Sequence, residues 1–452
     1  MSSTIWSVDE HLEDILAAVR PLEPIELQLP DAQGCVLVED VVVEVALPPF
    51  DNSSMDGYAV RVSDVEGASE EFPAVLTVVG DVAAGDGGLA GGRLLAPGEA
   101  ARIMTGAPLP EGAGAVVPVE WTDGGSGGGP ATAMRAHSEA PEGASGEVRV
   151  HRPAKAGAHV RTRGSDVRPG DLALRAGSVV GPAQIGLLAA IGRATVKVRP
   201  RPRVVVLSTG SELVPPGEEL SGGRIYDSNS FALTAAARDA GAIAYRVAAV
   251  ADDAATLRAT IEDQLIRADI VVTTGGVSVG AYDVVKEALS SFGHAPGDGA
   301  GDTEAGPGAD ADEPAGGIDF RRLAMQPGKP QGFGSIGPDH TPLLALPGNP
   351  VSAYVSFELF VRPAIRTLMG LDDVHRPAVR ATLAVEEALS SPSGRRQFLR
   401  GSYDAEAGTV TPVGGSGSYL VAALARADAL IVLPEDTTSA EPGTETEVIL
   451  LR

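Results

Sequence analysis

Three glycine-rich turns are the segments of this sequence best suited to binding chemistry. They are STGSEL (208–213), TTGGVSVG (273–280) and LPGNPVS (346–352), and each follows an apolar strand-like run. Glycine lets a backbone approach a ligand closely, and free N–H groups at a helix start attract anions. Asn349 and Pro350 suit the N-cap and first position of such a helix. The pattern predicts a site for a phosphate-bearing ligand such as a nucleotide, although neither GxxxxGK[ST] nor GxGxxG is present.

Charged side chains stand beside these turns. Glu212, Asp227 and Asp283 lie at or just after predicted strand ends, where carboxylates could hold Mg²⁺ against phosphate. Only four of the 35 basic residues are lysines, and two of them, Lys286 and Lys329, adjoin glycine-rich motifs. A compact ammonium suits an oxyanion. Taken singly, each acid is explained as well by a structural role, such as Asp227 capping a helix that begins at the next residue.

Other candidates lie outside this set. Asp56 in MDGYAV and Asp166 in RTRGSD could act as catalytic acids, but a turn or an ordinary loop explains each equally well. The seven histidines show no metal-ligand spacing, and no Ser-His-Asp arrangement is legible. The single cysteine, Cys35, sits in a valine-rich run and is expected in the core.

The elements that must position these residues alternate between strand and helix over 201–370, which predicts a parallel, doubly wound α/β domain. The expected strands are 204–210, 244–250, 269–276 and 343–348, and the expected helices are 228–240, 253–268, 283–292 and 350–369. Residues 295–317 carry six acids and no base, and we expect a disordered insertion there.

The flanking regions have different patterns. Ser7 and Glu10 have capping-box spacing before an apolar stripe, which predicts a helix over 7–19. Val36 to Val45 is expected to be one strand. Short strands between glycine and aspartate turns predict a β domain over 49–153, and a second β domain over 371–452. Residues 1–48 and 154–200 are of mixed character.

Length and charge limit the function. A chain of 452 residues suggests about three domains. The net charge of −25 disfavours nucleic acid and anionic membranes as partners. A lone cysteine, a start without a basic leader pattern and the lack of a run of about 20 apolar residues predict a cytoplasmic protein.

Taken together, the motifs resemble the molybdopterin molybdenumtransferase family, the bacterial MoeA proteins, to which the E domain of gephyrin is related. The resemblance covers essentially the whole chain in order and spacing. It is carried by PPFDNSSMDGYAVR (48–61), RIMTGAPLPEGAGAVVPVE (102–120), RTRGSDVRPGD (161–171), STGSEL (208–213), IYDSNS (225–230), TTGGVSVGAYDVVK (273–286), QPGKP (326–330) and LPGNPVS (346–352).

The resemblance implies an elongated homodimer of four-domain subunits. Residues 1–48 and 154–200 would form a discontinuous linker and dimerisation domain, with 49–153 inserted as a β domain. Residues 201–370 would form the molybdopterin-binding α/β domain, and 371–452 a C-terminal β-barrel. The implied reaction hydrolyses adenylylated molybdopterin and inserts molybdate into its dithiolene, giving molybdenum cofactor and AMP. Implied partners are the molybdopterin adenylyltransferase and apo-molybdoenzymes.

The resemblance also assigns site residues. It implies catalytic roles for Asp56, Asp166, Glu212, Asp283 and Lys329, with Asp56 and Asp166 reaching across from the second subunit. Mg²⁺ would be held by Glu212 and Asp283. Substrate would be bound by Gly210, Asp227, Gly275, Gly276, Ser278, Lys286, Pro330, Pro347, Gly348, Asn349, Pro350, Ser352, Arg396 and Ser418.

Two departures and two alternatives accompany this assignment. Ser211 stands where many family members carry Asp, so Glu212 acts without a second acid in its loop. Ser416 stands where Gln is common in the family. The first alternative is the adenylyltransferase that activates molybdopterin with ATP on the same α/β fold, against which the extra β domains argue. The second is a non-catalytic scaffold like part of gephyrin, against which the retained acids and lysines argue.

Overall fold

A computed structural model defines the conformation of most of the chain. It describes residues 5–134, 146–250, 253–276, 288 and 317–452. These form two compact units, the first comprising 1–26, 34–38 and 197–452 and the second 27–33 and 39–196. Of the helix predicted over 283–292, only Ala288 is described, and it is helical. Of the predicted insertion, only Gly317 is described, and it begins a strand.

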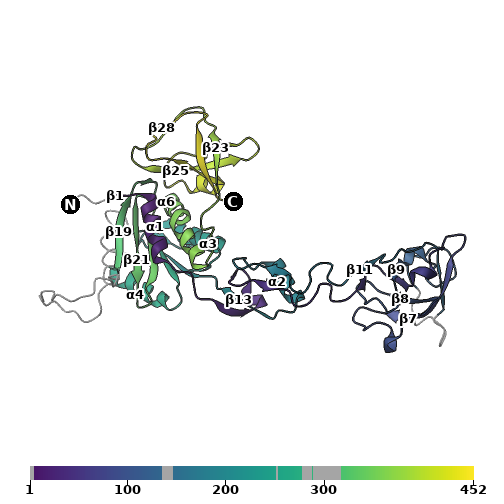
Figure 1. Cartoon of the computed structure of the whole chain (residues 1–452). Helices are drawn as coiled ribbons and strands as arrows, with labels where there is room; N and C mark the ends of the chain where they lie inside the picture. The colour runs from purple at the N-terminus through teal and green to yellow at the C-terminus, as the bar shows by residue number, and fades with distance from the viewer. Residues whose placement is uncertain (1–4, 135–145, 251–252, 277–287, 289–316) are drawn as a thin grey trace. The chain divides into compact units, whose positions relative to one another are not determined.

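A seven-stranded sheet is the centre of the first unit (Figure 1). Its order is β1-β19-β21-β22-β18-β14-β17, and β22, β18, β14 and β17 run parallel. The predicted parallel core is confirmed, but the sheet is not parallel throughout, because a short turn joins β21 to β22 and forces them antiparallel. The strands are β1 (Ile5–Trp6), β14 (Arg203–Ser208), β17 (Ile243–Arg246), β18 (Ile270–Thr274), β19 (Gly317–Leu323), β21 (Pro330–Ile336) and β22 (Thr341–Leu346).

Helices cover both faces of this sheet, because its parallel strands carry apolar side chains on both sides. Val204 and Val206 of β14 face a core shared with α1, α3, α6 and α7, whereas Val205 and Leu207 face a core shared with α4. The doubly wound prediction is therefore confirmed. The helices are α1 (Val8–Ala18), α3 (Asn229–Asp239), α4 (Ala254–Leu265), α6 (Pro350–Ser356), the π-helical turn η7 (Phe357–Val361) and α7 (Arg362–Leu368).

The C-terminal region of the first unit is a closed five-stranded barrel. The strands pair in the order β25-β26-β23-β29-β27, and β27 pairs back with β25 to close it. Its interior holds Leu383, Val410 and Ile431. The barrel strands and neighbouring elements are β23 (Ala378–Leu383), β25 (Arg396–Asp404), β26 (Thr409–Pro412), β27 (Ala429–Leu433), β29 (Glu445–Leu450), β20 (Met325–Gln326), β24 (Leu389–Ser390), β28 (Ser439–Ala440) and α8 (Val421–Arg426).

The second unit is built on a five-stranded sheet of order β10-β7-β8-β6-β9. Tyr58 and Val60 pack on one face, and Ala59 packs on the other, which explains why all of β6 is buried. The elements are β4 (Val41–Val42), β5 (Asn52–Ser53), β6 (Gly57–Val60), η2 (Val62–Asp64), β7 (Ala74–Val82), η3 (Ala90–Gly92), β8 (Glu99–Ile103), β9 (Ala115–Pro118), η4 (Val119–Trp121), β10 (Glu147–Val150), β11 (Val160–Arg161), β12 (Leu172–Leu174) and α2 (Pro182–Ala190).

Short elements mark the places where the chain passes between the units. They are β2 (Ile25–Gln28), η1 (Leu29–Ala32), β3 (Val36–Leu37) and β13 (Thr195–Arg199). The first unit also contains a pair of short strands, β15 (Leu213–Val214) and β16 (Ile225–Tyr226). The single strand predicted over 36–45 is wrong. The first strand of this segment ends at Leu37, because β3 pairs with β13 whereas β4 pairs with β12.

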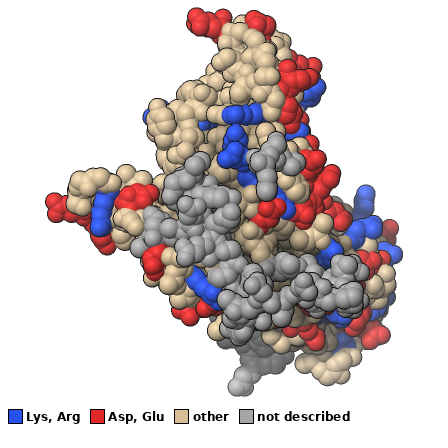
Figure 2. Space-filling view, turned by 90° about the vertical axis from the view of Figure 1, so that its left-hand side faces the viewer, with Lys and Arg blue, Asp and Glu red and all other residues tan. Residues whose placement is uncertain are grey.

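Charged side chains of both signs lie on the surface of the protein. On the face drawn in Figure 2, acidic side chains are scattered and basic ones lie among them. Several charged side chains of the described residues form ion pairs, such as Arg203 with Asp269 at 2.7 Å. Every helix among the described residues is too short or too polar to cross a membrane.

Helix α1 begins where predicted and buries a histidine. Ser7 Oγ accepts from Glu10 N at 3.0 Å, and Glu10 Oε2 accepts from Ser7 N at 2.7 Å, so the capping box is confirmed. His11, 1% exposed, stacks edge-on against Phe360 with ring centroids 4.8 Å apart. Burial, helped by the charge of Arg321, lowers the pKa of His11 from 6.5 to about 4.

We expect this histidine to make the first unit less stable in acid. As pH falls below 6.5 the unfolded chain takes up a proton that folded His11 accepts only near pH 4, so stability is lost between these values and unaffected above them. Urea unfolding should show a loss of about 2 kcal/mol at pH 5 relative to pH 7.5. His11→Gln should remove most of this difference, whereas exposed His375→Gln should retain it; equal losses in both variants would contradict the assignment.

Candidate active site

A cavity of about 690 Å³ lies at the carboxyl ends of β14, β18 and β22. Open α/β sheets bind ligands at this edge. The cavity is lined by Ser208, Thr209, Gly210, Glu212, Leu213, Ile225, Tyr226, Asp227, Ser228, Asn229, Thr274, Gly275, Gly276, Gln326, Pro327, Gly328, Lys329, Pro330, Pro347, Gly348, Asn349, Pro350, Ser352, Ser418 and Tyr419.

The turns that follow β14, β18 and β22 contact one another through backbone atoms. A Cβ on Gly275 would lie 2.3 Å from Thr209 O, and its φ of +100° is in the left-handed region. A Cβ on Gly348 would lie 3.4 Å from the Cα of Gly275. The glycine at 275 is therefore required by a close approach between β14 and β18, and the adjoining turns are held within one wall of the cavity.

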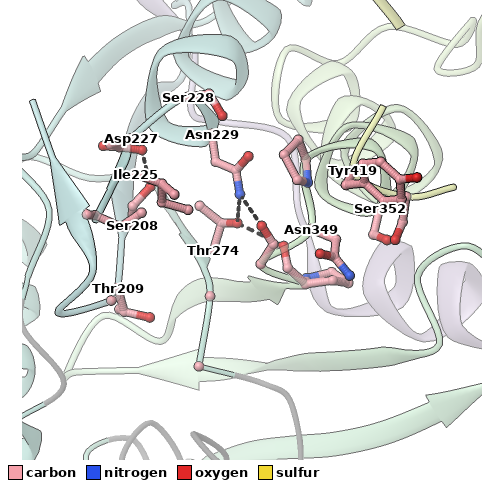
Figure 3. Close-up of a pocket in the computed structure, with 18 of the residues that line it drawn as sticks. Ser208, Thr209, Ile225, Asp227, Ser228, Asn229, Thr274, Asn349, Ser352 and Tyr419 are labelled. Atoms are coloured by element: carbon pink, nitrogen blue, oxygen red, sulfur yellow. Dashed lines mark hydrogen bonds between the residues drawn. The ribbon is translucent and has the colours of Figure 1, made fainter. Parts of the chain in front are cut away.

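Asn229 connects the turns by hydrogen bonds (Figure 3). Its Nδ2 donates to Thr274 Oγ1 at 3.0 Å and to Gly348 O at 2.7 Å. Thr274 Oγ1 donates in turn to Pro347 O at 2.9 Å. Sequence reasoning quoted the IYDSNS motif but did not single out Asn229, because an asparagine at a helix start normally signals only a cap.

The two acids that line the cavity differ in their surroundings. Asp227 is 2% exposed and accepts from Ser208 Oγ at 2.8 Å, from Ser230 N at 3.1 Å and from the Ser230 hydroxyl. Its carboxylate thus anchors the start of α3 to β14, which is the structural role left open by the sequence. Glu212 is exposed at the cavity, and within the part of the chain that the structure describes no hydrogen bond from another residue reaches its carboxylate.

Lys329 is the basic residue that lines the cavity. It is half-buried, and among the described residues its ammonium makes no ion pair. The loop before it is fixed by Gln331, whose Nε2 donates to Gly328 O at 2.7 Å and to Ser356 Oγ at 2.6 Å. A half-buried cation without a local counter-ion favours an anionic ligand.

The C-terminal region adds one loop to the wall. Ser418 O accepts from Val351 N at 3.0 Å, which joins this loop to the start of α6. Arg400, 2% exposed, donates to the carbonyls of Gly415 and Gly417, and burial lowers the pKa of its guanidinium. At the start of α6 Pro350 occupies the first turn as predicted, but the Asn349 side chain makes no capping hydrogen bond. The Asn349 amide lines the cavity and is not used as a cap.

The structure brings most of the proposed residues of the α/β domain together. Those lining the cavity are Gly210, Glu212, Asp227, Gly275, Gly276, Lys329, Pro330, Pro347, Gly348, Asn349, Pro350, Ser352 and Ser418. Ser278, Asp283 and Lys286 lie outside the described residues. Residues that line the cavity and that the sequence analysis did not select are Ser208, Thr209, Leu213, Ile225, Tyr226, Ser228, Asn229, Thr274, Gln326, Pro327, Gly328 and Tyr419.

Three proposed residues lie elsewhere. Arg396 does not line the cavity; it pairs with Asp9 at 2.8 Å and Glu435 at 3.0 Å. Asp56 and Asp166 belong to the second unit and are exposed. The Asp56 carboxylate accepts from Thr105 N at 2.7 Å and Thr105 Oγ1 at 2.9 Å, which orients it on its loop.

The described residues contain no group of three or more His, Cys, Asp or Glu side chains that could hold a metal ion. Mg²⁺ does not require such a group, because it is commonly bound by one or two carboxylates, water and substrate phosphates. Asp227 is committed to Ser208 and Ser230, so Glu212 is the lining carboxylate that fits this mode.

These features define a class: an α/β protein with a preformed, anion-attracting small-molecule site at the carboxyl edge of its sheet. The chain belongs to the MoeA family. Residues 6–192 match the MoeA N-terminal region (domain I and II), 205–303 and 304–367 match a probable molybdopterin binding domain, and 382–451 match the MoeA C-terminal region (domain IV).

Individual relatives agree along the full length. The chain is 44% identical over 442 residues to molybdopterin molybdenumtransferase 2 of Mycobacterium tuberculosis, covering 98% of each protein. It is 31% identical to the molybdopterin molybdenumtransferase of Bacillus subtilis, covering 98% of this chain and 94% of the relative. The solved structure of the molybdopterin biosynthesis moeA protein from Pyrococcus horikoshii is similar with a TM-score of 0.70 at 31% identity, over 99% of this chain and 100% of that one.

The contact between the turns can be tested with a single methyl group. Gly275→Ala should push Thr209 away and strain a positive φ, so we expect the first unit to lose about 1–3 kcal/mol of stability and the cavity to lose its ligand affinity. Gly222→Ala is the matched control, because nothing lies within 4 Å of a Cβ built there. Denaturant unfolding of both variants measures the difference; equal stability would refute the close approach.

Proposed function

We propose that this protein is the molybdenum insertase of molybdenum cofactor biosynthesis. It hydrolyses adenylylated molybdopterin and inserts molybdate into the dithiolene, giving molybdenum cofactor and AMP. The observation that carries the proposal is the glycine-lined cavity with the half-buried Lys329, which forms no ion pair with any described residue, located in the region that matches a molybdopterin binding domain. We further propose that it acts in the cytoplasm.

The proposed role of each residue in the cavity follows from its charge. The turns at Gly275 and Gly348 form one wall of the cavity, and Lys329 offsets phosphate or molybdate charge. Mg²⁺, when bound, supplies further positive charge that screens the phosphates; Glu212 is the described carboxylate placed to hold it, and Asp283 is the second proposed ligand. Glu212 is also the group placed to accept a proton from the attacking water.

We propose that the working form is a homodimer. Asp56 and Asp166 carry exposed carboxylates on the second unit, and Thr105 already holds Asp56 in one orientation. An exposed carboxylate that is held in one orientation, as Asp56 is, is suited to a site completed by another subunit. In this arrangement the partner copy would contribute the two acids that orient the metal-bearing end of the pterin.

An insertion assay tests the function directly. Purified protein is supplied with adenylylated molybdopterin, molybdate and Mg²⁺, and release of AMP and formation of cofactor that reactivates an apo-molybdoenzyme are measured. We expect both products, and Lys329→Ala should lower kcat/KM at least about a hundredfold because a buried anion would lose its counter-ion. Exposed Lys197→Ala should leave activity unchanged. Consumption of ATP with free molybdopterin would instead identify an adenylyltransferase, and no turnover would favour a scaffold.

Subunit mixing tests the shared site. Asp56→Ala and Lys329→Ala should each be inactive alone, but co-refolding equal amounts should restore about a quarter of wild-type activity. The reason is statistical: half of the dimers would be mixed, and each mixed dimer would contain one site with both residues intact. Activity that stays at the level of the separate variants, or a monomer by light scattering, would refute this arrangement.

A further inference from the structure

The strand order places a crevice inside the cavity. From β14 the chain crosses by α3 to β17 on one side, whereas β18 has β22 as its neighbour on the other side. The carboxyl ends of β14 and β18 therefore lie next to each other where the direction of winding reverses. In open α/β sheets this is where ligands enter between two strand ends.

Thr209 occupies this crevice. It is the first residue after β14, and its N–H donates to Thr274 O at 2.9 Å. Its Oγ1 would lie 2.9 Å from a Cβ on Gly275, so only the absence of a side chain at Gly275 leaves room around the hydroxyl. Thr209 is 4% exposed and lines the cavity, where Figure 3 shows it apart from the bonded Asn229 and Thr274.

The hydroxyl of Thr209 lacks a partner. Ser208 Oγ and Thr274 Oγ1, its neighbours in the cavity, each donate to an oxygen atom, but among the described residues nothing bonds to Thr209 Oγ1. A buried hydroxyl without a hydrogen bond is destabilising, so each such group in a native structure needs an explanation. Thr209 lines the cavity, where a ligand atom can supply the missing hydrogen bond. The position is thus suited to a ligand atom rather than to the folded chain alone.

We infer that Thr209, a lining residue of the cavity, is a further substrate-contacting residue, whose Oγ1 donates a hydrogen bond to a phosphate oxygen of the bound pterin once its side chain turns from its buried position. Two features select the phosphate: Lys329 supplies positive charge to the same cavity, and a hydroxyl can donate to an anionic oxygen. This inference rests on the proposed function, because it assumes that the cavity binds molybdopterin.

Thr273 provides a matched control. It lies on β18, is fully buried, and its Oγ1 is likewise unpartnered among the described residues, but it does not line the cavity. Thr209→Val and Thr273→Val therefore make the same chemical change in neighbouring strand ends of one sheet, and only the first alters a residue that lines the cavity. Thr209→Ser restores the hydroxyl.

The experiment measures the Kd of purified full-length protein for molybdopterin and for enzymatically dephosphorylated molybdopterin, together with the melting temperature of each variant. Thr209→Val should raise the Kd for molybdopterin about tenfold or more, while its melting temperature stays equal to or above that of the wild type. Thr209→Ser should bind within about threefold of the wild type, and Thr273→Val should bind as the wild type does. The dephosphorylated ligand should bind wild type and Thr209→Val equally.

Each result has a definite meaning. If wild-type protein binds neither pterin, the inference fails, and the insertion assay with adenylylated molybdopterin decides the proposed function separately. If the wild type binds but Thr209→Val binds equally well, or Thr273→Val weakens binding to the same extent, the inference is overturned while the proposed function stands. If the loss in Thr209→Val persists with the dephosphorylated ligand, the phosphate contact is wrong.

Discussion

The site depends on the close approach of three backbone turns at one edge of the sheet. Thr209 O lies where the first side-chain atom of any other residue at 275 would have to be, and Gly348 packs on the Cα of Gly275. Such an approach requires neighbouring parallel strands whose carboxyl ends lie side by side at the same edge of the sheet. The alternating apolar residues of β14 and β18, which pack against helices on both faces, hold the strands in that register.

Polar side chains then hold the turns in fixed positions. Asn229 is bonded to two of them, and Asp227 ties the start of α3 to the end of β14. These groups make their hydrogen bonds within the protein, whereas Lys329, Glu212, Asn349 and Thr209 are the lining residues that we propose to contact the ligand. The cavity is thus divided between residues that hold its shape and residues that are free to bind, and a rigid frame of this kind reduces the reorganisation that binding would otherwise require.

The acidic composition does not conflict with an anionic substrate. The net charge of −25 is a property of the whole chain, whereas the field inside the cavity is set by the few charges that line it. Asp227 is enclosed by hydroxyl and N–H donors, and Lys329 has no carboxylate bonded to it among the described residues. Local arrangement therefore decides what the cavity attracts, while the surface charge contributes to solubility.

The sequence by itself determined the family, the alternation of strands and helices, the capping box at Ser7 and most of the cavity lining of the α/β domain. Those features are local: short-range hydrogen bonds and apolar periodicity depend on residues only a few positions apart. Tertiary structure alone decided that Asn229 bonds across 119 positions to Gly348, that Arg396 pairs with Asp9, and that Thr209 is left without a partner. No spacing rule predicts such contacts, because they arise only when strand order brings distant turns together. The antiparallel turn at β21 and the break after Leu37 were missed for the same reason, since pairing partners, and not the propensity of a strand, set its direction and end.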